Sequence, residues 1–249
     1  MLQSRGSFWS SIPPVTKNLI IINFLVWMAA FILPNSLHID LNKYLGLHYW
    51  SAPDFNPAQL VTYMFMHSTQ SLAHIFFNMF SLFVFGRVLE QVWGGKRFLF
   101  FYISTGIGAA FVQEFMWMIT WENAFDLIDP TTGLVAMKGK EAVAYAIANG
   151  MNIGPFLNQF VTIGASGAVF GILLAFGMMF PNAPMYLFFI PIPIKAKYLV
   201  IGYGALELFF GVSGTDVGVA HFAHLGGMLF GLIIILYWKK KGVLGGKYF

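Results

Sequence analysis

Six apolar runs, each close to the length of a membrane-crossing helix, constrain this chain more than any other feature. A helix needs roughly 20 apolar residues to cross the hydrocarbon core of a bilayer. Such runs lie at about 15–33, 70–89, 97–119, 161–180, 198–212 and 219–238. Only 10% of the 249 residues are charged, against about 25% in soluble domains. We therefore predict an all-α membrane protein with one domain over residues 1–249, built as a bundle of six transmembrane helices.

The connections between these runs are uneven in length. Long loops are expected at 34–69 and 120–160, and a short glycine-rich loop at 211–219. The second long loop contains "KGKEAVAYAIANG", which is typical of an amphipathic helix. The run at 198–212 is the weakest span because it is short and carries Glu207.

The distribution of basic residues predicts the orientation. Loops on the cytoplasmic side of membrane proteins carry an excess of Lys and Arg. If the N-terminus is inside, the three outside loops hold only Lys43, Lys138 and Lys140. The inside segments hold eleven basic residues: Arg5, Lys17, Arg87, Lys96, Arg97, Lys195, Lys197, Lys239, Lys240, Lys241 and Lys247. We therefore expect both termini to be cytoplasmic and the loops at 34–69, 120–160 and 211–219 to be external.

Composition excludes several kinds of site. The chain has no cysteine, so it has no disulfide, no thiolate nucleophile and no cysteine metal site. No basic stretch interleaved with aromatic residues suggests nucleic-acid binding. The partners expected from the sequence are the lipid bilayer and other membrane proteins.

Four polar side chains are expected at one depth in the bilayer. The second, fourth and sixth runs all enter from the same side, and His74, Asn78, Ser166 and His224 lie within about two turns of their starts. At about 1.5 Å per residue, all four fall in the outer third of the membrane. Polar residues in spans are costly and usually face the bundle interior or a wet cavity.

Ser together with His is the minimal pair for nucleophilic acyl transfer. An imidazole takes the hydroxyl proton and later returns it to the leaving amine. The oxyanion that forms needs hydrogen-bond donors, which His, Asn and backbone N–H groups supply. His74 and Asn78 stand at i and i+4, so one helix face presents both.

Glycines surround these polar residues. Gly164 and Gly167 flank Ser166 and allow close approach of the backbone. Gly167 with Gly171, and Gly227 with Gly231, form two faces of the small-xxx-small type. Such faces let helices approach closely, so we expect the fourth helix to lie against the sixth and bring Ser166 toward His224.

Three motifs together resemble the signature elements of rhomboid intramembrane serine proteases. They are "HIFFN" at 74–78, "GASG" at 164–167 and "AHLGGMLFG" at 223–231, and the resemblance extends over about residues 15–240. It implies a six-helix bundle that cuts transmembrane substrate helices near their outer end, without metal or diffusible cofactor. It also implies that the loop at 211–219 caps the site and that the short fifth helix is a lateral gate.

The resemblance assigns roles to residues of this chain. Ser166 matches the nucleophile and His224 the general base, while His74 and Asn78 match the oxyanion-stabilising pair, acting with the Ser166 amide. Four residues match positions that support the site: Gly164, Gly167, Phe170 and Gly227. At the position of Phe170 the family often has Tyr. A Phe ring can stack on an imidazole, but it cannot form a hydrogen bond. The first loop also lacks the Trp-Arg pair of many members, which leaves the anchoring of that loop open.

The other ionisable residues have simpler interpretations. His221 and His224 at i and i+3 suggest a metal, but no third clustered carboxylate or cysteine is evident, so we expect none. His221 is interpreted as a wet structural histidine and His67 as an interfacial one. Asp216 is considered as a third catalytic member, but the expected mobility of its loop and the implied dyad argue against it. Glu207 is a functional candidate or a group that pairs within the bundle. Glu90 and Glu114 are interpreted as structural.

Two other functions compete with proteolysis. A rhomboid-like protein can bind transmembrane helices without cutting them, and Ser166 alone is compatible with a helix-packing serine. A transporter is a third interpretation, but the chain shows no broken helices in matching halves. The compact chain without an evident transit sequence predicts a prokaryotic plasma membrane.

Overall fold

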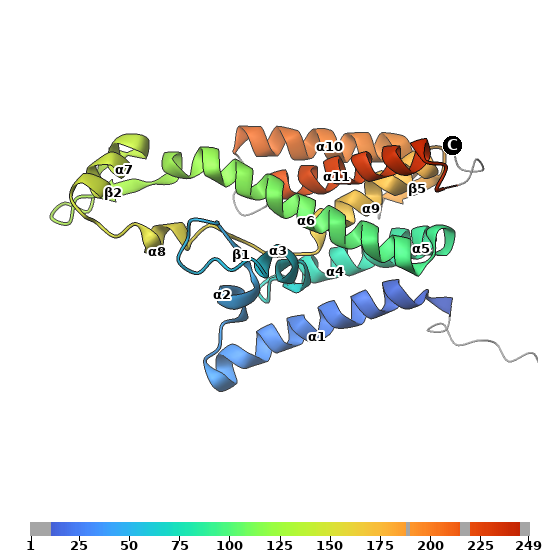
Figure 1. Cartoon of the computed structure of the whole chain (residues 1–249), viewed down its shortest axis with the longest axis horizontal. Coiled ribbons are helices and arrows are strands. Elements are labelled where there is room, and N and C mark those ends of the chain that lie inside the picture. Colours follow the sequence, from blue (N-terminus) through green and yellow to red (C-terminus); the bar gives the residue numbers. More distant parts are fainter. Residues whose placement is uncertain (1–10, 188–189, 215–219, 245–249) are drawn as a thin grey trace, which may run out of the picture.

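The computed structural model describes residues 11–187, 190–214 and 220–244. Every predicted apolar run forms a helix (Figure 1). The helices are α1 (Pro14–Leu37), α4 (Leu72–Ser81) continued by the π-helical turn η3 (Leu82–Gly86) and α5 (Arg87–Trp93), α6 (Gly95–Thr120), α9 (Ser166–Met179), α10 (Ala196–Ser213) and α11 (His221–Lys240).

Short elements fill the connections. In the first loop these are α2 (Leu41–Leu45), β1 (Leu47–His48), α3 (Gln59–Thr62) and η2 (Tyr63–Phe65). In the second they are η4 (Trp121–Ala124), β2 (Asp126–Ile128), β3 (Val135–Lys138), α7 (Gly139–Ala148), α8 (Gly154–Leu157) and β4 (Val161–Thr162). The hairpin β5 (Pro184–Leu187) and β6 (Ile190–Lys195) joins α9 to α10. The expected helix in the second loop is present as α7.

Four helices of the described residues are long and apolar enough to cross a membrane: Pro14–Leu37, Leu72–Trp93, Gly95–Ala124 and His221–Lys240. Ser166–Met179 is apolar but shorter. A helical membrane protein is therefore confirmed. The count of six spans and the orientation of the termini stay predictions.

The predicted fourth span is wrong at its start. The run was expected to be helical from 161, but Val161 and Thr162 form β4, which pairs antiparallel with β1. Gly164 follows with a φ of 132°, a conformation that only glycine adopts readily. The helix therefore begins at Ser166 itself. The other predicted boundaries differ from the structure by a few residues at each end.

The centre of the bundle is formed by α6, α9 and α11. An added Cβ at Gly227 would lie 1.8 Å from the Gly167 carbonyl oxygen, and one at Gly231 would lie 3.3 Å from the Gly171 Cα. The two small-residue faces therefore meet as expected, backbone against backbone. Around them lie fully buried Phe98, Phe101, Ile172 and Ile235, among others.

Helix α1 lies along one edge of the molecule and α10 with α11 along the opposite edge (Figure 1). An entirely apolar cavity of about 780 Å³ separates α1 from α4, lined by residues such as Phe24, Ile75 and Phe80. At its N-terminal end α1 is held by Glu90, whose carboxylate accepts from the Val15 and Thr16 amides at 2.9 and 2.7 Å. The expected structural role of Glu90 is thus a cap on another helix.

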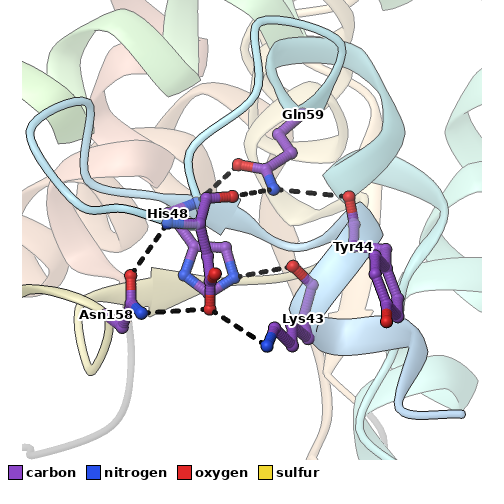
Figure 2. A network of polar contacts seen from close by, with 6 residues as sticks. Lys43, Tyr44, His48, Gln59 and Asn158 are labelled. Atoms are coloured by element: carbon purple, nitrogen blue, oxygen red, sulfur yellow. Dashed lines mark hydrogen bonds and ion pairs between the residues drawn. The ribbon is translucent and has the colours of Figure 1, made fainter. Parts of the chain in front are cut away.

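The first loop is anchored by a buried polar network (Figure 2). The Gln59 side chain, 1% exposed, accepts from the His48 amide at 3.2 Å and donates to the carbonyls of Tyr44 and Asp54 at 3.3 and 3.0 Å. Asn158, from the second loop, donates to the Asp54 carboxylate at 3.0 Å. These contacts anchor a loop that lacks the Trp-Arg pair.

Candidate active site

Ser166 occupies the first turn of α9, where the backbone amides have no hydrogen-bond partner within the helix. The first helical hydrogen bond runs from the Val169 amide to the Ala165 carbonyl at 3.0 Å, so the amides of 166–168 precede the helical ladder. The preceding Gly164 amide donates to the Tyr63 carbonyl at 2.9 Å. This bond and the β1–β4 pairing fix the chain as it enters the helix. Free amides and the positive end of the helix dipole favour an oxyanion beside Ser166.

His224 lies in the first turn of α11, opposite Ser166. Its Nε2 is 2.8 Å from Ser166 Oγ, a hydrogen bond between groups 58 residues apart. The hydroxyl donates when Nε2 is the unprotonated nitrogen of the ring. The close contact of Gly227 with Gly167, one turn below His224, allows this approach.

Phe170 supports the imidazole from one side. Its ring stacks on the His224 ring with centroids 4.3 Å apart and planes inclined by 10°. The stacking expected from the sequence is present. Because Phe has no hydroxyl, the ring restrains the imidazole through packing alone.

His74 lies on the other side of Ser166. Its Nδ1 accepts from the Ser68 amide at 3.3 Å, so the neutral ring carries its proton on Nε2. An added Cβ at Gly164 would lie 2.8 Å from that Nε2 and 3.5 Å from Ser166 Oγ. The Nε2–H is thus directed toward the region beside the serine, and a side chain at Gly164 would obstruct it.

Asn78 lies one turn further along α4 and is buried. Its amide donates to the His74 carbonyl at 2.8 Å, while its Oδ1 is buried without a hydrogen-bond partner among the described residues. The structure therefore gathers Ser166, His224 and His74 around one point, whereas the Asn78 amide contacts the His74 carbonyl.

The sequence indicated Glu207 as a functional candidate or a bundle-pairing group, but not its partners. Glu207 Oε2 lies 2.6 Å from His221 Nδ1 and 2.9 Å from His224 Nδ1. The expectation that no carboxylate clusters with the two histidines is wrong, because α10 brings Glu207 against α11. His221, expected to be wet, is only 6% exposed. The only available signal was an acidic residue in an apolar run, which is costly unless it is paired.

Residues 54–241 match the rhomboid domain family, which is three quarters of the chain. The chain belongs to the rhomboid family.

Three curated relatives are similar to this rhomboid. Rhomboid-like protein 11, chloroplastic, of Arabidopsis thaliana is 26% identical over 219 residues, or 81% of this chain and 63% of its own length. Rhomboid protein 1, mitochondrial, of Saccharomyces cerevisiae is 27% identical over 176 residues, or 70% of this chain and 40% of its own length. Rhomboid protease AarA of Providencia stuartii is 27% identical over 180 residues, or 69% of this chain and 52% of its own length. The chain thus aligns with roughly half of each relative.

The remaining candidates in this rhomboid have other surroundings. His67 is 1% exposed with its ring centroid 5.1 Å from that of His74, so it is buried within the protein, and its interfacial depth stays a prediction. Burial lowers the pKa of His67 to about 3, which keeps its imidazole neutral. Glu114 accepts from the Trp50 amide at 2.8 Å, as a structural residue would. Asp216 and most of the expected cap loop lie outside the described residues.

A groove of about 430 Å³ lies beside this cluster. It lies between α4, α9 and α10, and its walls include Phe77, Leu173 and Tyr203. Phe170, which stacks on His224, also lines it. The groove therefore reaches the ring that supports the imidazole.

Proposed function

We propose that this chain is an intramembrane serine endopeptidase that cleaves transmembrane substrate helices near their outer end. The observation that carries the proposal is the 2.8 Å contact between Ser166 Oγ and His224 Nε2. It joins two helices through a hydroxyl nucleophile and a base, a pair that performs nucleophilic acyl transfer. Membership of the rhomboid family and the similarity to a rhomboid protease support it.

The chemistry follows from these groups. His224 Nε2 takes the hydroxyl proton as Ser166 Oγ forms a bond to the scissile carbonyl carbon. The carbonyl oxygen becomes an oxyanion, which the Ser166 amide, His74 Nε2–H and the Asn78 amide stabilise. His224 then returns the proton to the leaving amine as the C–N bond breaks. A water molecule then attacks the acyl-enzyme carbonyl while His224 takes its proton. His224 returns this proton to Ser166 Oγ as the ester bond breaks, which frees the serine. No step requires a metal or cofactor.

The substrate approaches through the groove between α4 and α10. Its apolar walls suit a transmembrane segment, and it reaches Phe170 next to the base. In this proposal α10 is the lateral gate. The two relatives with organelle names are chloroplastic and mitochondrial, so the prokaryotic plasma membrane stays a prediction.

The proposal is tested by labelling detergent-purified protein with a fluorophosphonate probe. The probe reacts only with an activated serine, so labelling is expected in wild type and absent in Ser166→Ala and His224→Ala. Thermal melting of all three proteins checks that the fold survives. Equal labelling of the variants, or none in wild type either in detergent or in bilayers, contradicts the proposed dyad and favours a helix-binding protein without protease activity.

A further inference from the structure

Glu207 is the most unusual residue close to the catalytic pair. It stands in the middle of α10, and its side chain is 13% exposed. A carboxylate in an apolar helix is costly unless it is paired. Its Oε2 faces two imidazoles of the neighbouring helix α11, those of His221 and His224.

His221 holds the carboxylate in place. Its Nδ1 lies 2.6 Å from Glu207 Oε2, and an ionised carboxylate only accepts hydrogen bonds, so that nitrogen is the donor. Phe210 stacks on the His221 ring with centroids 5.7 Å apart. The orientation of the carboxylate is therefore set by α11 and by the packing of α10 on it.

The same oxygen reaches the second nitrogen of the catalytic ring. It is 2.9 Å from His224 Nδ1, although the Nδ1–H does not point along this line and makes no well-aligned hydrogen bond. Attraction between charges depends on distance more than on alignment. At this distance the carboxylate stabilises a positive imidazole strongly even without a linear bond.

We propose that Glu207 is a positioning residue for His224. Its carboxylate favours the tautomer with the proton on Nδ1, which leaves Nε2 free to accept from Ser166. It also faces the positive charge that the ring acquires on taking the serine proton. Glu207, His224 and Ser166 thus form an acid–base–nucleophile series, with the acid supplied by the proposed gate helix. The inference rests on the proposed function.

The distances favour this arrangement over a metal site. The ligand atoms of Glu207, His221 and His224 lie within 4.8 Å of one another, as a cation would need. However, ligands of a tetrahedral zinc with bonds of 2.0–2.1 Å stand about 3.3 Å apart. Separations of 2.6 and 2.9 Å between the oxygen and the two nitrogens are those of direct contacts.

The test compares Glu207→Gln, which removes the charge, with Glu207→Asp, which keeps it on a shorter side chain. The rate of fluorophosphonate labelling is measured against probe concentration. Loss of base positioning slows the chemical step, so Glu207→Gln is expected to lower the maximal rate roughly tenfold or more. The half-saturating probe concentration should hardly change. Glu207→Asp is expected to recover part of the rate.

A second readout does not depend on activity. Histidine ¹⁵N NMR identifies which ring nitrogen of His224 carries the proton. We expect Nδ1–H in wild type and a larger share of Nε2–H in Glu207→Gln. Glu90→Gln is the matched control, because Glu90 is also buried but binds amides of α1, and it should leave the tautomer of His224 unchanged.

The outcomes separate the two proposals. Wild-type labelling with unchanged rate and tautomer in Glu207→Gln overturns the role of Glu207 and leaves the dyad standing. A wild type that is never labelled overturns the proposed function itself, whatever the tautomer. Labelling of wild type that changes on treatment with a chelator would assign the three side chains to a bound cation instead.

Discussion

At the scale of single residues, glycines decide whether the proposed catalytic pair can meet. Ser166 and His224 belong to different helices, and a hydrogen bond between them requires backbones closer than side chains normally allow. Gly227 provides this, since an added Cβ would lie 1.8 Å from the Gly167 carbonyl oxygen. Backbone atoms on both sides leave no flexible group that can move aside.

We predict that Gly227→Ala lowers the free energy of unfolding by about 1–3 kcal/mol and abolishes labelling by the probe. The added methyl group must push α11 away from α9, which separates His224 from Ser166. Thermal melting and labelling in detergent measure both effects. Gly202→Ala is the control, because nothing lies within 4 Å of an added Cβ there. Equal melting temperatures of the two variants would show that the contact is not tight.

At the scale of elements, the first loop and the strand that precedes Ser166 form one unit. Strand β1 pairs with β4, with Leu47 opposite Thr162. Two residues after β4 comes Gly164, and Ser166, the proposed nucleophile, follows two residues later. Gln59 holds β1 through the His48 amide. The polar network of Figure 2 therefore supports the turn that precedes Ser166 through the strand pair.

Replacing Gln59 by Leu is expected to destabilise the protein by about 1–3 kcal/mol, because it leaves buried backbone groups without partners. It should also slow labelling of Ser166, since β4 loses the support of β1. Lys43→Ala is the comparison: its 3.8 Å ion pair with Asp54 involves a side chain that is 55% exposed, so its loss should change stability by less than about 1 kcal/mol. Hydrogen exchange of the amides in 161–164 measures the loosening. Unchanged exchange in Gln59→Leu would contradict the coupling.

At the scale of the whole molecule, the order of helices brings the polar residues to one end of the bundle. The starts of α4, α9 and α11 lie together at that end. The three helices run in the same direction, and the helices that join them run in the opposite direction. The positive-inside rule assigns this end to the outside. Since the chain has no cysteine, this assignment can be tested with single cysteines.

We expect Lys138→Cys, in the exposed strand β3, to react with a membrane-impermeant maleimide in intact cells. Lys240→Cys, at the end of α11, should react only after the membrane is permeabilised. Both side chains are exposed in the structure, so a difference in reactivity reports the side of the membrane and not burial. The opposite pattern would reverse the predicted orientation and place the active site near the cytoplasm.

The sequence was sufficient to predict the helices, the family and the contact between Ser166 and His224, the proposed catalytic pair. Hydropathy identifies membrane helices because a bilayer accepts few other structures, and polar residues stand out among apolar ones. The meeting of the Gly167 and Gly227 faces was also predictable, since small residues at that spacing serve mainly for close packing.

Only the tertiary structure decided how the site is supported. No local pattern shows that 161–165 leaves the helix, because the β1–β4 pairing joins residues more than a hundred positions apart. Glu207 and His224 belong to different helices, and their contact depends on how α10 packs and rotates against α11. Periodicity describes one helix at a time, whereas a side chain's partners are set by the rotation and depth of its neighbours.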